Sequence, residues 1–157
     1  MMECQTNEKM HTECSSDEVI VRDYTPSDFP GLYRLLSTVY QSTVTKAELE
    51  CHYVAPEKEI LLAFRDTQLV GCAFLSYNTD YIRRSHTVFV TYVAVDESVR
   101  HCGIGRILFS EIEKRARSRG CTAVELTSAD SRTVAHAFYQ ALNFTKKKTT
   151  VFIKELG

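Results

Sequence analysis

The residues from Thr91 to Thr127 show the pattern of a strand, a turn, a helix and a second strand, and this unit constrains the fold most. Thr87 to Val95 is rich in Val, Thr, Phe and Tyr, which favour strands. Cys121 to Thr127 is a second, apolar strand. Between them, apolar residues recur at the spacing of one helix face: Ile104, Ile107, Leu108, Ile112 and Ala116. This order predicts a parallel strand pair joined by a right-handed crossover.

The segments before this unit predict an antiparallel meander with helices. Val19 to Tyr24 is a short β-rich run, and Thr25 to Asp28 is a helix start with proline at the first helical position. Thr45 to Glu48 is a second start, of the capping-box type. Glu59 to Arg65 and Leu69 to Tyr77 resemble two strands joined by a polar hairpin turn. We therefore expect an α+β (mixed α/β) fold.

The two ends of the chain differ in character. Residues 1–18 are polar and lack apolar periodicity, so we expect a disordered N-terminal tail before one domain at residues 19–157. Ala135, Phe138 and Leu142 mark one face of a last helix. Phe144 to Leu156 then has β-type residues around a polar turn. The prediction is a mixed, mostly antiparallel sheet of about six to seven strands with about four helices.

Composition excludes several classes of protein. A net charge of -1 over 157 residues gives no pull toward nucleic acid. No apolar run approaches the roughly 18 residues of a membrane span, so no membrane partner is expected. The six cysteines lack metal-ligand spacing, so we predict reduced thiols, no metal and a cytoplasmic location.

A glycine-containing turn precedes the helix that starts near Ile104. A helix start exposes backbone N–H groups without internal partners and carries partial positive charge, which suits a phosphate. Glycine lets the ligand approach the backbone, and guanidinium groups add charge beside it. The candidate anion-binding residues are Arg100, His101, Cys102, Gly103, Ile104, Gly105 and Arg106.

A dinucleotide-binding fold is the main alternative at this turn, because Glu125 lies where a ribose-binding acid would be expected. Against it, Leu108 occupies the third glycine position, and the preceding strand ends several residues before Gly103. The unit also lies behind antiparallel strands. A phosphate-binding loop of the G-x-x-x-x-G-K-[ST] type is absent from the sequence.

The chain resembles the GNAT superfamily of acyl-CoA-dependent N-acyltransferases in two motifs. Arg100-x-x-Gly103-x-Gly105 is similar to its pyrophosphate motif R/Q-x-x-G-x-G/A, and it follows a strand end at Val93 to Asp96. Ala135 to Tyr139 with Leu142 to Phe144 is similar to its second motif, A-x-x-F-Y-x-x-x-G-F. The order of elements from Val19 to Leu156 also fits, so the resemblance covers all but the tail.

The resemblance implies a fold, a cosubstrate and roles for particular residues. Acetyl-CoA would be the cosubstrate, with the backbone of the strand Val93, Ala94 and Val95 beside its pantetheine arm. The amides from His101 to Arg106 would hold its pyrophosphate. Tyr139 would act as general acid toward the leaving thiolate, and the backbone N–H of Val95 would face the carbonyl oxygen. The alternative for Tyr139 is a core aromatic residue.

The sequence departs from the family pattern where an acid often lies just before the position of Val93. Tyr92 is found there, so the general base is unidentified, with His86, Asp80, Tyr92 or ordered water as candidates. Arg132 stands where many relatives have asparagine.

Three functions remain open at this point. The first is acetyl transfer to a primary amine, with a small molecule favoured over a protein lysine or N-terminus. The second is an acetyl-CoA-binding regulatory module without turnover, which the missing acid favours. The third is a dinucleotide-dependent oxidoreductase. The expected partners are acetyl-CoA and an amine acceptor, and a homodimer is kept open.

Overall fold

The computed structural model describes residues 18–157, so the prediction of a disordered tail falls, apart from Glu18, outside the described residues. In chain order the elements are β1 (Val19–Asp23), the 3-10 turn η1 (Pro26–Asp28), α1 (Phe29–Tyr40), α2 (Lys46–Tyr53), β2 (Lys58–Arg65), β3 (Gln68–Asp80), β4 (Ser85–Val95), the 3-10 turn η2 (Glu97–Val99), α3 (Ile104–Ser118), β5 (Ala123–Leu126) and α4 (Thr133–Ala141).

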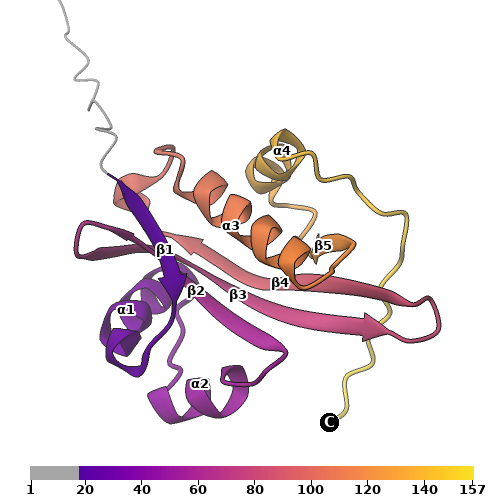
Figure 1. The fold of residues 1–157 in the computed structure, drawn as a ribbon, viewed down its shortest axis with the longest axis horizontal. Helices are drawn as coiled ribbons and strands as arrows, with labels where there is room; N and C mark the ends of the chain where they lie inside the picture. Colours follow the sequence, from indigo (N-terminus) through magenta and orange to yellow (C-terminus); the bar gives the residue numbers. More distant parts are fainter. Residues whose placement is uncertain (1–17) are drawn as a thin grey trace, which may run out of the picture.

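The strands form one twisted sheet between two helical layers (Figure 1). Its order is β1-β2-β3-β4-β5. The first three neighbouring pairs are antiparallel, and β4 pairs with β5 in parallel across the α3 connection. The predicted hairpin and the predicted parallel unit are therefore confirmed. A dinucleotide-binding fold has a mostly parallel sheet. This sheet is mostly antiparallel, so the dinucleotide-binding alternative is excluded.

The sheet has five strands among the described residues, fewer than the six to seven predicted. The difference lies in Phe144 to Leu156, where β-type residues predicted strands, because residues 145–157 form none. β-propensity expresses packing against neighbouring strands. The side chains of Val151, Phe152 and Ile153 are 81 to 92% exposed and contact no such neighbour. In Figure 1 the chain after α4 is drawn as coil up to the C-terminus and adds no strand to the sheet.

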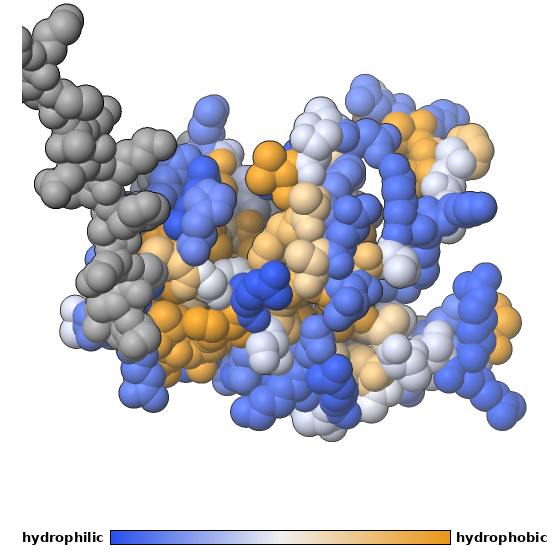
Figure 2. Space-filling view, turned by 90° about the horizontal axis from the view of Figure 1, so that it is seen from above, coloured by the Kyte–Doolittle hydropathy of each residue, from blue (hydrophilic) through white to orange (hydrophobic). Residues whose placement is uncertain are grey.

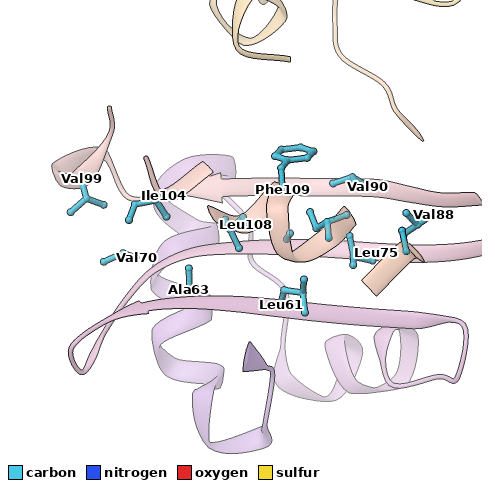
Figure 3. Packing of buried hydrophobic residues seen from close by; sticks show 13 residues of the cluster. Leu61, Ala63, Val70, Leu75, Val88, Val90, Val99, Ile104, Leu108 and Phe109 are labelled. Atoms are coloured by element: carbon cyan, nitrogen blue, oxygen red, sulfur yellow. The ribbon is translucent and has the colours of Figure 1, made fainter. Parts of the chain in front are cut away.

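One face of the sheet packs against α3 and α4. Leu108, Phe109 and Ile112 on α3 are fully buried against residues of β2, β3 and β4 such as Leu61 and Leu75. Figure 3 shows Leu108 on the side of α3 that faces Leu61 and Leu75, while the Phe109 ring points the other way, where it contacts Phe138 and Tyr139 of α4. The helix face that the sequence predicted to be apolar is therefore the face of α3 that packs into this core.

The other face packs against α1 and α2. Leu32, Leu35 and Leu49 from the two helices pack with Leu62 and Phe74 of the sheet. Because β2 and β3 have helices on both faces, successive residues of each strand are buried rather than alternating. In the space-filling view, apolar patches lie between hydrophilic side chains on the outer surface (Figure 2).

Both predicted helix starts have local capping interactions. The Glu48 carboxylate accepts hydrogen bonds from the Thr45 backbone N–H (2.8 Å) and hydroxyl (2.7 Å). The Asp28 carboxylate accepts equivalent bonds from Thr25, both at 2.8 Å. These residues are close in sequence, so their pairing is set locally.

Candidate functional site

The strands β4 and β5 separate after a short paired stretch. Their pairing runs from Thr87 opposite Ala123 to Val90 opposite Leu126, and β5 ends there. β4 continues to Val95 and is paired beyond Val90 only with β3. The edge of β4 from Thr91 to Val95 therefore offers backbone groups to a ligand that approaches from the β5 side.

A β-bulge lies at the point of separation. Tyr92 is opposite Phe74 and Val90 is opposite Leu75, so Thr91 is an extra residue on β4. A bulge bends its strand and is common beside functional sites. The bulge residue Thr91 directly follows Val90, the last residue of β4 that is paired with β5. The bulge and the end of the pairing together make the last part of β4 diverge from β5.

The backbone direction along β4 decides which residues face this open edge. The Asp96 N–H donates to the Val70 carbonyl at 2.9 Å, so Asp96 faces β3. Groups on alternate residues point to opposite edges, so Val93 and Val95 face the open edge and Ala94 faces β3. Ala94 is also only 2% exposed. Of the predicted strand residues, Val93 and Val95 can thus meet a ligand, while Ala94 is buried behind them.

The predicted anion-binding turn connects η2 to α3. His101 (φ 65°) and Gly103 (φ 83°) have left-handed backbone conformations, which reverse the chain before the helix. The Ile107 N–H donates to the Gly103 carbonyl at 3.1 Å as the helix begins. The amides of Ile104, Gly105 and Arg106 precede it and have no acceptor within the helix. Three amides at a helix start suit an anion such as a phosphate.

The two glycines of the turn have different roles. A Cβ on Gly103 would have no heavy atom within 4 Å, so this position is open to a ligand. A Cβ on Gly105 would lie 2.9 Å from Cζ of Phe138 on α4. The sequence explains both glycines by space for a phosphate, and the structure adds a packing role at Gly105. Its missing side chain allows α4 to pack on α3.

Cationic side chains flank the turn. Arg100 pairs with Glu97 at 3.0 Å, and both side chains are largely exposed. An exposed pair of this kind is worth little, so a phosphate can compete for the guanidinium. Arg106, in the first turn of α3, and His101 are exposed. Cys102 is partly buried and donates its N–H to the Val99 carbonyl at 3.3 Å, which shapes the turn.

Tyr139 lies on α4 among aromatic rings. Its ring is 5.9 Å from that of Phe109 and 6.0 Å from that of Phe144, at steep angles. The ring packs at the edge of the core, as expected of a core aromatic residue. The residue is only partly buried, as a general acid that must reach its substrate requires. The structure therefore fits both interpretations of Tyr139. Burial raises the pKa of Tyr139, against the opposing effect of the Arg132 cation. The phenol thus keeps its proton at neutral pH.

The proposed general bases do not gather at this site. His86 and Asp80 lie at the far end of the β3–β4 hairpin, where Asp80 pairs with Arg83 and His86 bonds Thr79. His86 is six residues before Tyr92, about 20 Å along a strand. Tyr92 is the one candidate that borders the open edge of β4.

Sequence reasoning missed Tyr40, the last residue of α1. Its hydroxyl donates a 2.5 Å hydrogen bond to the Val93 carbonyl, the group that faces the open edge. Burial raises the pKa of its phenol, and Arg132 and Tyr139 both act on that phenol electrostatically. No sequence signal marks Tyr40, because 53 residues separate it from Val93.

Other features of the described residues lie elsewhere or are absent. A cavity of about 380 Å³ lies at the β1–β2 side of the sheet and contains none of the predicted site residues. Within residues 18–157, no group of three or more His, Cys, Asp or Glu side chains could hold a metal ion. No helix in that range is long and apolar enough to cross a membrane.

Comparison with protein families gives a match to the acetyltransferase (GNAT) family over residues 29–144. Comparison with curated protein sequences gives no match.

Solved structures with the same fold cover most of the chain. One is an aminoglycoside acetyltransferase from an uncultured soil metagenomic sample in complex with trehalose (TM-score 0.78, 18% identity, 88% of this chain and 97% of that chain). Another is an acetyltransferase from Trypanosoma brucei (TM-score 0.75, 21% identity, 88% and 100%). A third is AAC(6')-Iy with the bisubstrate analogue CoA-S-monomethyl-acetylneamine (TM-score 0.78, 20% identity, 89% and 99%).

The fold and the family match together define an acyltransferase of the N-acetyltransferase type. The chain belongs to the GNAT family of acetyltransferases, because the family match spans well over half of its 157 residues.

Proposed function

We propose that this protein transfers an acetyl group from acetyl-CoA to a primary amine of a small molecule. The observation that carries the proposal is the open edge of β4, where Val93 and Val95 lie at the same end of the sheet as the start of α3. An extended pantetheine arm can pair with such an edge as a strand would. With the pantetheine arm along this edge, the pyrophosphate of acetyl-CoA would lie near the uncapped amides at the start of α3.

The residues present fit acetyl-CoA in shape and in charge. The amides of Ile104, Gly105 and Arg106 would hold the pyrophosphate, with Gly103 leaving space and Arg100 adding charge. Val93 and Val95 would pair with the pantetheine amides, and the Val93 carbonyl can accept this bond beside that of Tyr40, since it has two lone pairs. The thioester of the bound cosubstrate supplies an activated acetyl group.

Tyr139 acts in this proposal as the general acid. As the amine nitrogen bonds to the acetyl carbon, the carbon–sulfur bond breaks and the sulfur takes the phenolic proton. For the neutral amine, the nitrogen releases one proton to water and the Tyr139 phenolate regains one, so these two transfers balance. An amine that binds as the ammonium ion first loses one further proton to water, so its overall reaction releases one proton. The raised pKa of Tyr139 keeps the phenol protonated before each turnover.

The backbone N–H of Val95 is proposed to stabilise the negative charge that develops on the carbonyl oxygen. The amine proton leaves to ordered water in this proposal, because His86 and Asp80 lie at the end of the β3–β4 hairpin that is far from Val95. The proposal extends to a single domain at residues 19–157. It also includes a cytoplasmic location, which suits the unpaired thiols of Cys51, Cys72 and Cys121.

A homodimer belongs to the proposal as well. A second copy would cover the exposed apolar side chains of Val151, Phe152 and Ile153. Light scattering should then give twice the mass of one chain, and the mass of a single chain would refute the dimer.

The direct test is an assay of thiol release from acetyl-CoA with a panel of primary amines. We expect amine-dependent release together with an N-acetylated product seen by mass spectrometry. Tight binding of acetyl-CoA without turnover of any amine would favour the regulatory module instead. Acetylation of a lysine peptide or a peptide N-terminus in preference to small amines would favour a protein substrate.

A further inference from the structure

Four aromatic side chains form a continuous row beside the open edge of β4. They come from α1, α2, β3 and β4, and we call them the aromatic arc: Tyr40, Tyr53, Phe74 and Tyr92. Adjacent rings meet edge to face, with centroids 4.9 Å apart for Tyr53 and Phe74, 5.9 Å for Phe74 and Tyr92, and 5.5 Å for Tyr92 and Tyr40. Such contacts hold each ring in a defined orientation.

The arc has a buried base and an exposed end. Phe74 is 2% exposed and packs in the core under α1 and α2. Tyr92, by contrast, is 46% exposed although it is a large aromatic residue in the middle of the sheet. An aromatic ring that is held by its neighbours on one side and exposed on the other is suited to stack against a ligand.

The arc borders the position where transfer is proposed to occur. Tyr92 lies between the bulge residue Thr91 and Val93. Tyr40 bonds the Val93 carbonyl, and its phenol is close enough to Tyr139 and Arg132 for both to influence its pKa. A molecule stacked on Tyr92 and Tyr40 would therefore lie beside the open edge of β4 and near the Tyr139 phenol.

Two cationic side chains lie near the arc, Arg132 and Lys58. Burial raises the pKa of Tyr40, and among the described residues the one group charged at neutral pH that acts on it is Arg132, which lowers it. Lys58 places its Nζ 5.1 Å from the ring centroid of Tyr53. The arc thus has a cation near each end, and Arg132 is also near Tyr139.

Two other tyrosines of the molecule differ from those of the arc, because their hydroxyls donate to carboxylates. Tyr24 and Tyr77 donate hydrogen bonds to Glu50 (3.3 Å) and Glu59 (2.9 Å). Burial and Glu50 together raise the pKa of Tyr24 to about 12. No described carboxylate acts in this way on Tyr40 or Tyr53. At the Tyr53 end, Asp23 and Glu59 line the same cavity as Tyr53 and Lys58. At the Tyr40 end, by contrast, a second cationic group of a ligand would find Arg132 and no carboxylate that acts on the phenol.

From these contacts and charges we infer that the aromatic arc is the acceptor subsite, and that it selects an amine carried on an aromatic body without a second cationic group. This rests on the proposed function and names its substrate class. The ring of the acceptor stacks on Tyr92, and its amine points to the open edge of β4. The nearby Arg132 cation disfavours the protonated amine and so assists loss of its proton before attack.

The test compares three amines in the thiol-release assay: 2-phenylethylamine, 2-cyclohexylethylamine and sisomicin. The first two have similar shape, but only the first has a π face, and sisomicin carries several amines. We expect kcat/KM to be highest for 2-phenylethylamine. Tyr92→Ala should lower that value about tenfold, whereas Tyr92→Phe should keep most of it. Tyr81→Ala, at a residue 86% exposed on the hairpin tip, is the matched control and should change nothing.

Calorimetry with 2-phenylethylamine in the presence of CoA gives a readout without turnover. Heat of binding that is present in the wild type and strongly reduced in Tyr92→Ala supports the arc. Higher kcat/KM for sisomicin, or wild-type values in Tyr92→Ala, would overturn the arc while leaving amine transfer intact. Absence of turnover with every amine would count against the proposed function, and absence of binding heat would then overturn the arc too.

Discussion

Tyr139 carries the chemical step of the proposal, and its environment suits a proton donor more than a nucleophile. Its ring is fixed by Phe109 and Phe144, and burial raises the pKa of its phenol. A tyrosine is protonated below its ordinary pKa of about 10, and a raised pKa extends that range upward. The wild-type kcat should therefore show no loss of this acid between pH 7 and about pH 9.5.

Removal of the hydroxyl tests this role. Tyr139→Phe keeps the aromatic packing, so acetyl-CoA affinity and thermal stability should stay near wild type. The value of kcat should fall about 100-fold, the usual contribution of a general acid. Tyr33→Phe, on a 40% exposed ring of α1, is the control and should leave kcat unchanged. An unchanged kcat in Tyr139→Phe would exclude the general-acid role and would show that Tyr139 is only a packing residue of the aromatic core.

At the scale of elements, the connection from β1 to α1 depends on one carboxylate. Asp28 accepts two 2.7 Å hydrogen bonds from the Arg22 guanidinium and two 2.8 Å bonds from Thr25. These partners, Arg22 first, hold the pKa of Asp28 well below its ordinary value. The carboxylate therefore stabilises the fold above the unfolded pKa of about 4, and this stabilisation is lost as the pH falls through the folded pKa.

Denaturant unfolding of the variant Asp28→Asn should measure this contribution of the Asp28 carboxylate to stability. Its free energy of unfolding should be lower than that of the wild type by about 1 to 2 kcal/mol at pH 7. The difference should shrink progressively below about pH 4, where Asp28 of the unfolded wild-type chain takes up a proton that the folded carboxylate still resists. Glu48, in the corresponding box at α2, is exposed, so Glu48→Gln should give a smaller loss. An equal loss for Asp28→Asn at pH 2 and pH 7 would exclude an ionic origin.

The elements that could be predicted from sequence are those whose determinants are local. Both capping boxes, the β2–β3 hairpin and the buried face of α3 follow from residues a few positions apart. Val151 to Ile153 was predicted wrongly, because a strand needs a neighbour to pair with and this segment has none.

The features that make the site escaped prediction because they depend on distant residues. The bulge at Thr91 is defined only by the register of β4 against β3. The bond from Tyr40 to Val93 joins residues 53 positions apart. The role of Gly105 appears only once α4 is packed on α3 through Phe138. The turn from Arg100 to Arg106 could be found from sequence because it is a continuous motif.

At the scale of the whole molecule, the site is made by the separation of two strands at one end of a sheet. α3 crosses from β4 to β5 and begins at the same end, so its uncapped amides and the open edge of β4 face a common region. α1 and α2 bring the aromatic arc from the opposite face, and α4 brings Tyr139. Each helical layer thus contributes one part of the proposed reaction.

The central claim is that the turn before α3 holds CoA, and calorimetric titration with CoA tests it most directly. Gly103 (φ 83°) and Gly120 (φ 71°) are both left-handed and open, so alanine strains each by about 1 kcal/mol. Only Gly103 lies in the proposed site. We predict binding heat for the wild type and Gly120→Ala, with affinity about tenfold weaker in Gly103→Ala. No heat at millimolar CoA, or equal affinity in the two variants, would contradict the account.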